Sequence, residues 1–152
     1  MTDYRLLCEQ AAALCEGVSC RISNLANLSA LLFGTLPDLN WAGFYLAEGK
    51  ELLLGPFQGK TACTVIPFGK GVCGTSAEKD QVLVVDDVHA FPGHIACDGA
   101  SRSEIVLPLH LDGAVFGVLD IDSPLLARFT EEDRLGLTTL IAVIEGMLAV
   151  SF

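Results

Sequence analysis

The sequence predicts an α+β fold in which N- and C-terminal helices pack on one side of a central, largely antiparallel sheet. Apolar residues recur at helical spacing near both ends of the 152-residue chain. The middle contains short alternating or continuously apolar segments, which are typical of strands. Tight turns join several of these segments, and this favours antiparallel neighbours because parallel strands need longer crossovers. No stretch has the composition of a linker, so we expect one domain over residues 1–152.

The elements can be placed in chain order from their apolar periodicity. Residues 3–33 form one or two helices, interrupted near Gly17. A short helix follows the glycine-rich segment 69–74, and a long polar loop covers 86–103. The closing helix runs from Thr130 to Val150, because Thr130 is a suitable N-cap and three acidic residues follow it. The predicted strands are 40–46, 51–54, 61–66, 81–85, 104–110 and 114–121.

Composition excludes several classes of protein. The chain has 9 Lys and Arg against 19 Asp and Glu, which gives a net charge of −10, and 51% of its residues are hydrophobic. That apolar content argues against disorder, and the scarcity of basic residues argues against binding a phosphate backbone. The start of the chain lacks the features of a signal peptide, and Glu145 interrupts the apolar stretch 135–152. We therefore expect a cytoplasmic protein whose six cysteines serve thiol chemistry, metal binding or core packing.

The hairpin at Asp112-Gly113 has two possible registers. A two-residue turn pairs residue 111 with 114, and Glu104 then shares a face with Ile121. A three-residue loop pairs 110 with 114, which puts Glu104 opposite Asp120 with Asp122 on the same face. We favour the three-residue loop, because three converging carboxylates are what a positively charged ligand requires.

Trp41 and Tyr45 share one face of the strand 40–46 and are aromatic neighbours of that acidic face. Core packing is the ordinary role of such aromatics. Together with the carboxylates they predict a pocket with an apolar end and an acidic end. A pocket of this kind suits a small zwitterion, or an amine with an apolar tail.

Three cysteines are candidates for chemistry. Cys97 lies in the long polar loop, and Cys73 lies at a glycine-bounded helix start, where backbone N–H groups favour a thiolate. Cys63 lies in the predicted strand 61–66. Burial alone could account for each of them, and a zinc site formed by Cys63, Cys73, His94 and Cys97 is an alternative, although its spacing lacks close cysteine pairs. The other cysteines, Cys8, Cys15 and Cys20, fall on amphipathic helices and are read as bystanders.

Six motifs resemble those of the free methionine-(R)-sulfoxide reductases, which are single GAF-domain enzymes. The resemblance covers about residues 40–123, and the flanking helices fit the GAF layout. Its most specific part combines FPGHIACD with three cysteines spaced ten and twenty-four residues apart. The motifs are NWAGFY at 40–45, GPFQGK at 55–60, GKGVCG at 69–74, DVHAFPGHIACD at 87–98, SEIV at 103–106 and GVLDIDS at 117–123.

The resemblance implies roles for individual residues. Cys97 matches the catalytic cysteine, Cys63 a resolving cysteine, and Cys73 a third cysteine that acts as an alternative or second resolving thiol. The acidic residues that bind substrate and assist the chemistry are matched by Glu104, Asp120 and Asp122. The aromatic wall around the substrate methyl group is matched by Trp41 and Tyr45.

The implied reaction agrees with the chemistry of these residues. A thiolate attacks a sulfoxide sulfur only when the oxygen is protonated or hydrogen-bonded, and crowded carboxylates raise the pKa of one member enough to supply that proton. The resulting sulfenic acid condenses with a second thiol, and a dithiol such as thioredoxin reduces the disulfide. No cofactor is implied, and a homodimer is expected. The alternative is a GAF module that binds a small molecule or senses redox state without turnover.

Overall fold

A six-stranded sheet organises the computed structural model, which describes residues 1–95, 97 and 99–152. Ala96 and Asp98 of the FPGHIACD motif lie outside the described residues. The strand order is β3-β2-β1-β6-β5-β4, and every pairing between described strands is antiparallel, as expected. The strands are β1 (Trp41–Glu48), β2 (Glu51–Gly59), β3 (Val65–Pro67), β4 (Leu83–Val85), β5 (Ser103–Leu111) and β6 (Ala114–Ser123).

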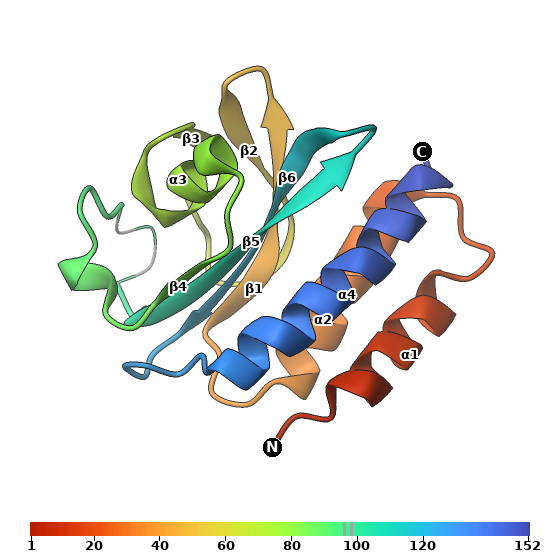
Figure 1. Ribbon diagram of the computed structural model, residues 1–152, viewed down its shortest axis with the longest axis horizontal. Coiled ribbons are helices and arrows are strands. Elements are labelled where there is room, and N and C mark those ends of the chain that lie inside the picture. Colours follow the sequence, from red (N-terminus) through yellow and green to blue (C-terminus); the bar gives the residue numbers. More distant parts are fainter. Residues whose placement is uncertain (96, 98) are drawn as a thin grey trace.

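The N- and C-terminal helices pack together on one side of this sheet, which confirms their predicted position (Figure 1). They are α1 (Tyr4–Cys15), α2 (Arg21–Thr35) and α4 (Glu131–Ala149). The short helix α3 (Gly71–Lys79) lies against the other face, where it contacts β5 and β6. A 3₁₀ turn, η1 (Val88–Ala90), interrupts the long loop. None of the helices in the described part of the chain has the length and apolar character needed to cross a membrane.

The start of α4 follows from its sequence. Thr130 and Asp133 form a capping box, in which each side chain accepts a hydrogen bond from the other residue's backbone N–H. The hydroxyl of Tyr4 donates to the second carboxylate oxygen of Asp133 at 2.6 Å, which joins α1 to α4. This single acidic side chain therefore both caps one helix and anchors another.

The alternation of β1 divides the interior into two cores. Ala42 and Phe44 face the three long helices, whereas Trp41 and Tyr45 face α3. All four side chains are at least 98% buried. The sheet is thus apolar on both faces, and the second face is the one that carries the candidate site.

The β5–β6 hairpin corrects the predicted loop. Leu111 pairs with Ala114, so the turn has two residues, and both Asp112 (φ 54°) and Gly113 (φ 77°) adopt the positive φ that a type I′ turn requires. The expected three-residue loop is therefore wrong. A β-bulge next to the turn inserts Phe116 between Val115, which pairs with His110, and Gly117, which pairs with Leu109.

The bulge has the same effect on strand faces as the predicted three-residue loop, because it places Glu104 on the same face of the sheet as Asp120 and Asp122. An uninterrupted two-residue hairpin would place Glu104 on the face opposite to Asp120 and Asp122, and one extra residue on β6 reverses that parity. All three acids consequently share one face, as predicted. Glu104 lies opposite Asp122 rather than Asp120, which lies opposite Val106.

Candidate active site

Three buried carboxylates form the floor of the candidate site. Glu104, Asp120 and Asp122 are only 6%, 6% and 8% exposed. Burial is the main cause that holds the pKa of Asp120 well above 3.8, and the charges of Asp122 and Glu104 add to it. The Oδ1 atom of Asp120 is buried without a hydrogen-bond partner among the described residues. This floor favours a bound proton or cation.

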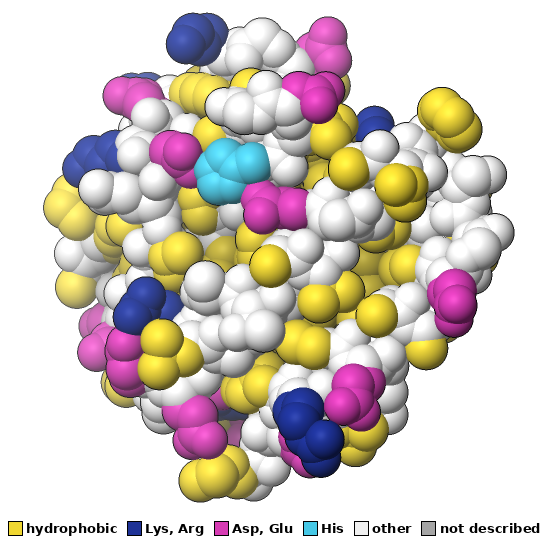
Figure 2. Space-filling model, turned by 45° about the vertical axis from the view of Figure 1, so that its right-hand side comes forward, with side chains coloured by type: hydrophobic (Ala, Val, Ile, Leu, Met, Phe, Trp, Pro, Cys, Tyr) yellow, Lys and Arg dark blue, Asp and Glu magenta, His cyan; other side chains and the backbone are white. Residues whose placement is uncertain are grey.

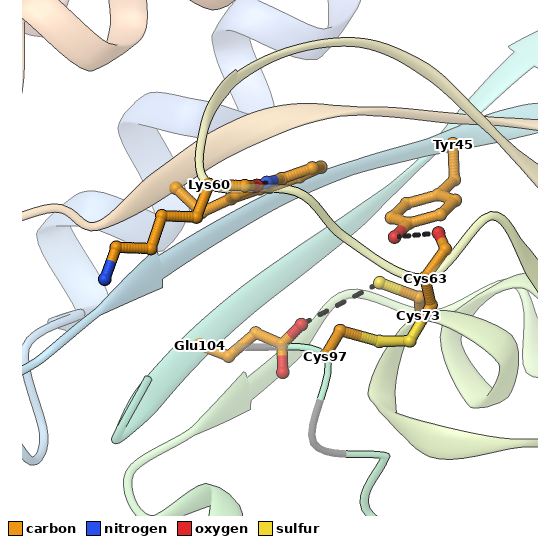
Figure 3. The surroundings of a disulfide bond; sticks show 7 residues. Tyr45, Lys60, Cys63, Cys73, Cys97 and Glu104 are labelled. Carbon is orange, nitrogen blue, oxygen red and sulfur yellow. Dashed lines mark hydrogen bonds between the residues drawn. A yellow bond between two sulfur atoms is a disulfide. The ribbon is translucent and has the colours of Figure 1, made fainter. Parts of the chain in front are cut away.

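Cys73 faces the floor from α3. Its thiol donates to Oε2 of Glu104 across 3.8 Å, and Figure 3 shows the two side chains pointing toward each other. Burial, followed by the charges of Asp120 and Glu104, raises the pKa of the Cys73 thiol well above 9. Cys73 is therefore a protonated thiol at neutral pH rather than the thiolate expected at a helix start.

An aromatic wall lies beside the acids. The ring of Trp41 stacks on Phe57 with centroids 5.1 Å apart and on Tyr45 at 5.8 Å. The indole N–H donates to the carbonyl of Lys60 at 3.1 Å, so the polar edge of the ring is satisfied. The predicted combination of an apolar side and an acidic side is present on this face of the sheet.

A disulfide joins Cys63 to Cys97, which are 34 positions apart in the sequence and have Cα atoms 5.4 Å apart (Figure 3). Cys63 does not lie in a strand as predicted, because β3 begins only at Val65. The backbone at Cys63 has left the sheet, and the hydroxyl of Tyr45 donates to its carbonyl at 2.8 Å in place of a neighbouring strand. This departure from the sheet is what allows Cys63 to reach the long loop.

These elements line a partly open cavity of about 50 Å³, several times the ~10–15 Å³ that one water molecule needs. Every predicted site residue lines this cavity except Cys63, which is bonded to the lining residue Cys97 through the disulfide. Sequence reasoning missed Lys70 and Ser101, although both lie in segments already singled out, namely the GKGVCG motif and the long loop. The lining consists of Trp41, Tyr45, Ala62, Ile66, Lys70, Gly71, Val72, Cys73, His94, Ile95, Cys97, Ser101, Glu104, Asp120 and Asp122.

The predicted zinc ligands do not form one cluster here. Cys63 and Cys97 are bonded to each other, so two of the three proposed thiolates are already used. The described groups that converge closely enough to share an ion are instead Cys73, Glu104 and Asp120. The arrangement places a disulfide next to an aromatic wall and a buried acid whose pKa is raised, which suits thiol redox chemistry on a small cationic molecule.

Comparisons with known proteins agree with this geometry. Residues 7–147 match the GAF domain family. The chain is 56% identical over 139 residues to the free methionine-R-sulfoxide reductase of Escherichia coli strain K12, covering 91% of this chain and 84% of that protein.

Two solved structures are similar over nearly the whole chain. The reduced form of fRMsr of Staphylococcus aureus has a TM-score of 0.95 at 52% identity, covering 98% of this chain and 97% of that one. The free methionine-R-sulfoxide reductase of Neisseria meningitidis in complex with its substrate has a TM-score of 0.91 at 46% identity, covering 95% and 87%. The chain therefore belongs to the free methionine-R-sulfoxide reductases of the GAF-domain family.

Proposed function

We propose that this protein reduces free L-methionine-(R)-sulfoxide to methionine, with Cys97 as the attacking thiol and Cys63 as the resolving thiol. The observation that carries this proposal is the Cys63–Cys97 disulfide at a cavity that also contains three buried carboxylates. A disulfide is the product that such a cycle leaves on the protein. Two relatives of this chain are named free methionine-R-sulfoxide reductase, and this supports the same reaction.

The acidic floor binds the substrate ammonium. Three carboxylates with little exposure are costly to bury without a positive partner, and an ammonium group supplies one. The apolar wall of Trp41 and Tyr45 contacts the substrate methyl group on the other side. Fixing both ends sets which face of the sulfur meets Cys97, and hence which epimer reacts. Methionine sulfoxide within a protein lacks the free ammonium and is rejected.

The first chemical step transfers the sulfoxide oxygen to the protein. A proton held by the carboxylate cluster, carried by Asp120 in the resting protein, moves to the sulfoxide oxygen. The Cys97 thiolate attacks the sulfur and forms an S–S bond to it. The protonated oxygen then moves from the substrate sulfur to the Cys97 sulfur, so the substrate S–O bond and the new S–S bond break, a Cys97 S–O bond forms and methionine leaves. The protein retains the oxygen as a sulfenic acid on Cys97.

The second step restores the thiols. Cys63 attacks the Cys97 sulfenic acid, which forms the disulfide and releases water. Thioredoxin then supplies two electrons and two protons through dithiol exchange. The cycle needs no bound cofactor, and it requires a reducing compartment, for which we propose the cytoplasm.

A homodimer assembled through the helical side completes the proposal. Large hydrophobic side chains reach the surface on this side (Figure 2), including Leu14 at 39%, Val18 at 40% and Ile22 at 57% exposure. An apolar groove also runs between α1 and α4, lined in part by Ala11, Val143 and Met147. Burying these groups against a second copy would remove them from water.

The activity is tested by NADPH consumption with thioredoxin and thioredoxin reductase. Separated R and S epimers of free methionine sulfoxide are compared with the N-acetylated R form. We expect turnover of the free R epimer alone. Cys97→Ser should abolish it, while Cys8→Ser, on α1 far from the cavity lining, should not. Full activity of Cys97→Ser would refute the mechanism, and no turnover of any sulfoxide by reduced, folded protein would favour a non-catalytic sensor.

A further inference from the structure

The thiol of Cys73 is left outside the proposed cycle, yet it meets the acidic floor. Its Sγ lies 3.8 Å from Oε2 of Glu104. One ligand atom from each of Cys73, Glu104 and Asp120 falls within 4.8 Å of the other two. All three residues are at most 6% exposed. The cluster stays intact in the disulfide form, because Cys73 remains a free thiol there.

These separations fit one small dication. With Zn–S near ~2.3 Å and Zn–O near ~2.0–2.2 Å, neighbouring tetrahedral ligand atoms lie about 3.5 Å apart. The observed 3.8 Å between sulfur and oxygen is close to that value, and shifts of side-chain rotamers within a cavity can close the rest. A sulfur ligand beside two carboxylates favours Zn²⁺ over Mg²⁺ or Ca²⁺, which prefer oxygen alone.

The floor also contains a buried carboxyl oxygen that has no hydrogen-bond partner among the described residues. It is Oδ1 of Asp120, although a buried carboxylate oxygen ordinarily has such a partner. Crowded negative charge disfavours a bare thiolate, whereas a dication bound between the same groups stabilises it. Coordination would release both the thiol proton and the proton held on Asp120 to solvent, and it would replace the Cys73–Glu104 hydrogen bond with two bonds to the metal.

We propose that Cys73, Glu104 and Asp120 form a site for a thiophilic divalent cation of the Zn²⁺ type, and that metal and substrate exclude each other there. The exclusion rests on the proposed function, because it assumes that the substrate ammonium occupies the same carboxylates. The metal site itself does not. Bound zinc would hold the protein in an inactive state until a chelator removed it.

Cobalt is the probe for the metal site, since a thiolate ligand gives Co²⁺ a charge-transfer absorption band. The sample is the disulfide form of the full chain with Cys8, Cys15 and Cys20 replaced by Ser, which leaves Cys73 as its free thiol. We expect one Co²⁺ per chain, displaced by Zn²⁺, with a thiolate band. Adding Cys73→Ser should remove the band, and Asp120→Asn should weaken binding by ~10-fold or more.

Two results would overturn the metal site: an unchanged band in the Cys73→Ser protein, or unchanged affinity in Asp120→Asn. If Cys73→Ser does not fold, the Asp120→Asn measurement decides alone. The Asp112→Asn variant, altered in an exposed turn, is the matched control and should bind as the background does.

Mutual exclusion is measured in a second background with Cys63→Ser and Cys97→Ser, which cannot turn over. Free methionine-(R)-sulfoxide should lower the apparent Co²⁺ affinity, and the N-acetylated form should not. Failure to compete would overturn the exclusion while the spectral result stood. Absence of sulfoxide turnover by the metal-free wild-type protein would instead refute the proposed function.

Discussion

Glu104 on β5 lies directly opposite Asp122 on β6, so two acidic side chains face each other inside the protein. Opposed like charges destabilise an antiparallel pair, and Asp120 adds a third acid on the same face. The β-bulge at Phe116 is what creates this arrangement, because without it Glu104 would face the helices. The fold therefore contains a local irregularity whose effect is to concentrate negative charge at the candidate site, at a cost to stability.

That cost can be measured with Asp120→Asn. The amide removes a buried acid and can donate to neighbouring carboxylates, so we expect the free energy of unfolding at pH 7 to rise by about 1–3 kcal/mol. Turnover of free methionine-(R)-sulfoxide should fall, because the proton source is lost. Thermal denaturation and the coupled assay measure the two effects. A variant that was both less stable and fully active would contradict this account of the acidic floor.

The buried carboxyl group of Asp120 also makes the stability of the protein depend on pH. Burial and neighbouring charges raise the pKa of Asp120 in the folded protein, so the folded state binds more protons than the unfolded state. Stability should therefore decline as pH rises from about 3.8 through the raised folded pKa, and Asp120→Asn should flatten that decline. Asp112→Asn, in the exposed turn, should keep the wild-type profile.

Local patterns in the sequence predicted the faces of the strands but not their exact pairing. Alternation fixes which residues share a face, so the placement of Trp41, Tyr45 and the three acids was correct. Alternation does not reveal a bulge, because one inserted residue and one longer loop have the same effect on parity. The prediction that Glu104 lies opposite Asp120, rather than Asp122, was wrong for that reason.

Long-range contacts decided the remaining differences. Cys63 was assigned to a strand from its apolar surroundings, whereas the disulfide to Cys97 and the hydroxyl of Tyr45 hold it outside the sheet. Lys70 was overlooked because only the meeting of α3 with the long loop brings it to the cavity. None of these contacts has a signal within a short window of sequence.

The assignment of Cys63 predicts a single turnover in Cys63→Ser. The variant should release about one methionine per chain and then stop, because the Cys97 sulfenic acid lacks its partner. Cys73 should not replace it efficiently, since its buried thiol has a raised pKa and forms little thiolate. Rapid-quench measurement of methionine, with dimedone trapping of the sulfenic acid, checks this. Steady turnover at the wild-type rate would assign the resolving role to Cys73.

The position of α3 depends on Gly74. A Cβ atom at this residue would lie 2.4 Å from the carbonyl oxygen of Pro67, so Gly74→Ala must displace the helix that carries Cys73. We expect a loss of about 1–3 kcal/mol in stability together with weaker substrate binding. The matched change Gly146→Ala, on α4 with nothing within 4 Å, should instead stabilise the protein by ~0.5–1 kcal/mol. Equal effects at the two glycines would exclude close packing of α3 as the cause.

The contacts of the His110 ring predict a second pH dependence of stability, separate from that of Asp120. Its Nε2 lies 2.6 Å from Asp80 and its Nδ1 lies 2.7 Å from Glu145, which links the end of α3 to α4 through the β5–β6 hairpin. Partial burial lowers the pKa of His110, but the two hydrogen bonds and the acidic charges outweigh it and raise the pKa above 6.5.

The stabilisation from His110 should be complete below pH 6.5 and disappear as pH rises through the raised pKa of the folded protein. Because the side chain is 39% exposed, solvent screening limits the effect to about 1 kcal/mol or less. Denaturant melts from pH 5.5 to pH 9 should show this decline in the wild type and a smaller decline in His110→Gln, in which the contribution of Asp120 remains. His89→Gln, which alters a side chain that is 66% exposed, is the control and should follow the wild-type curve. If His110→Gln retained the full decline above pH 6.5, the bridge between α3 and α4 would not contribute to stability.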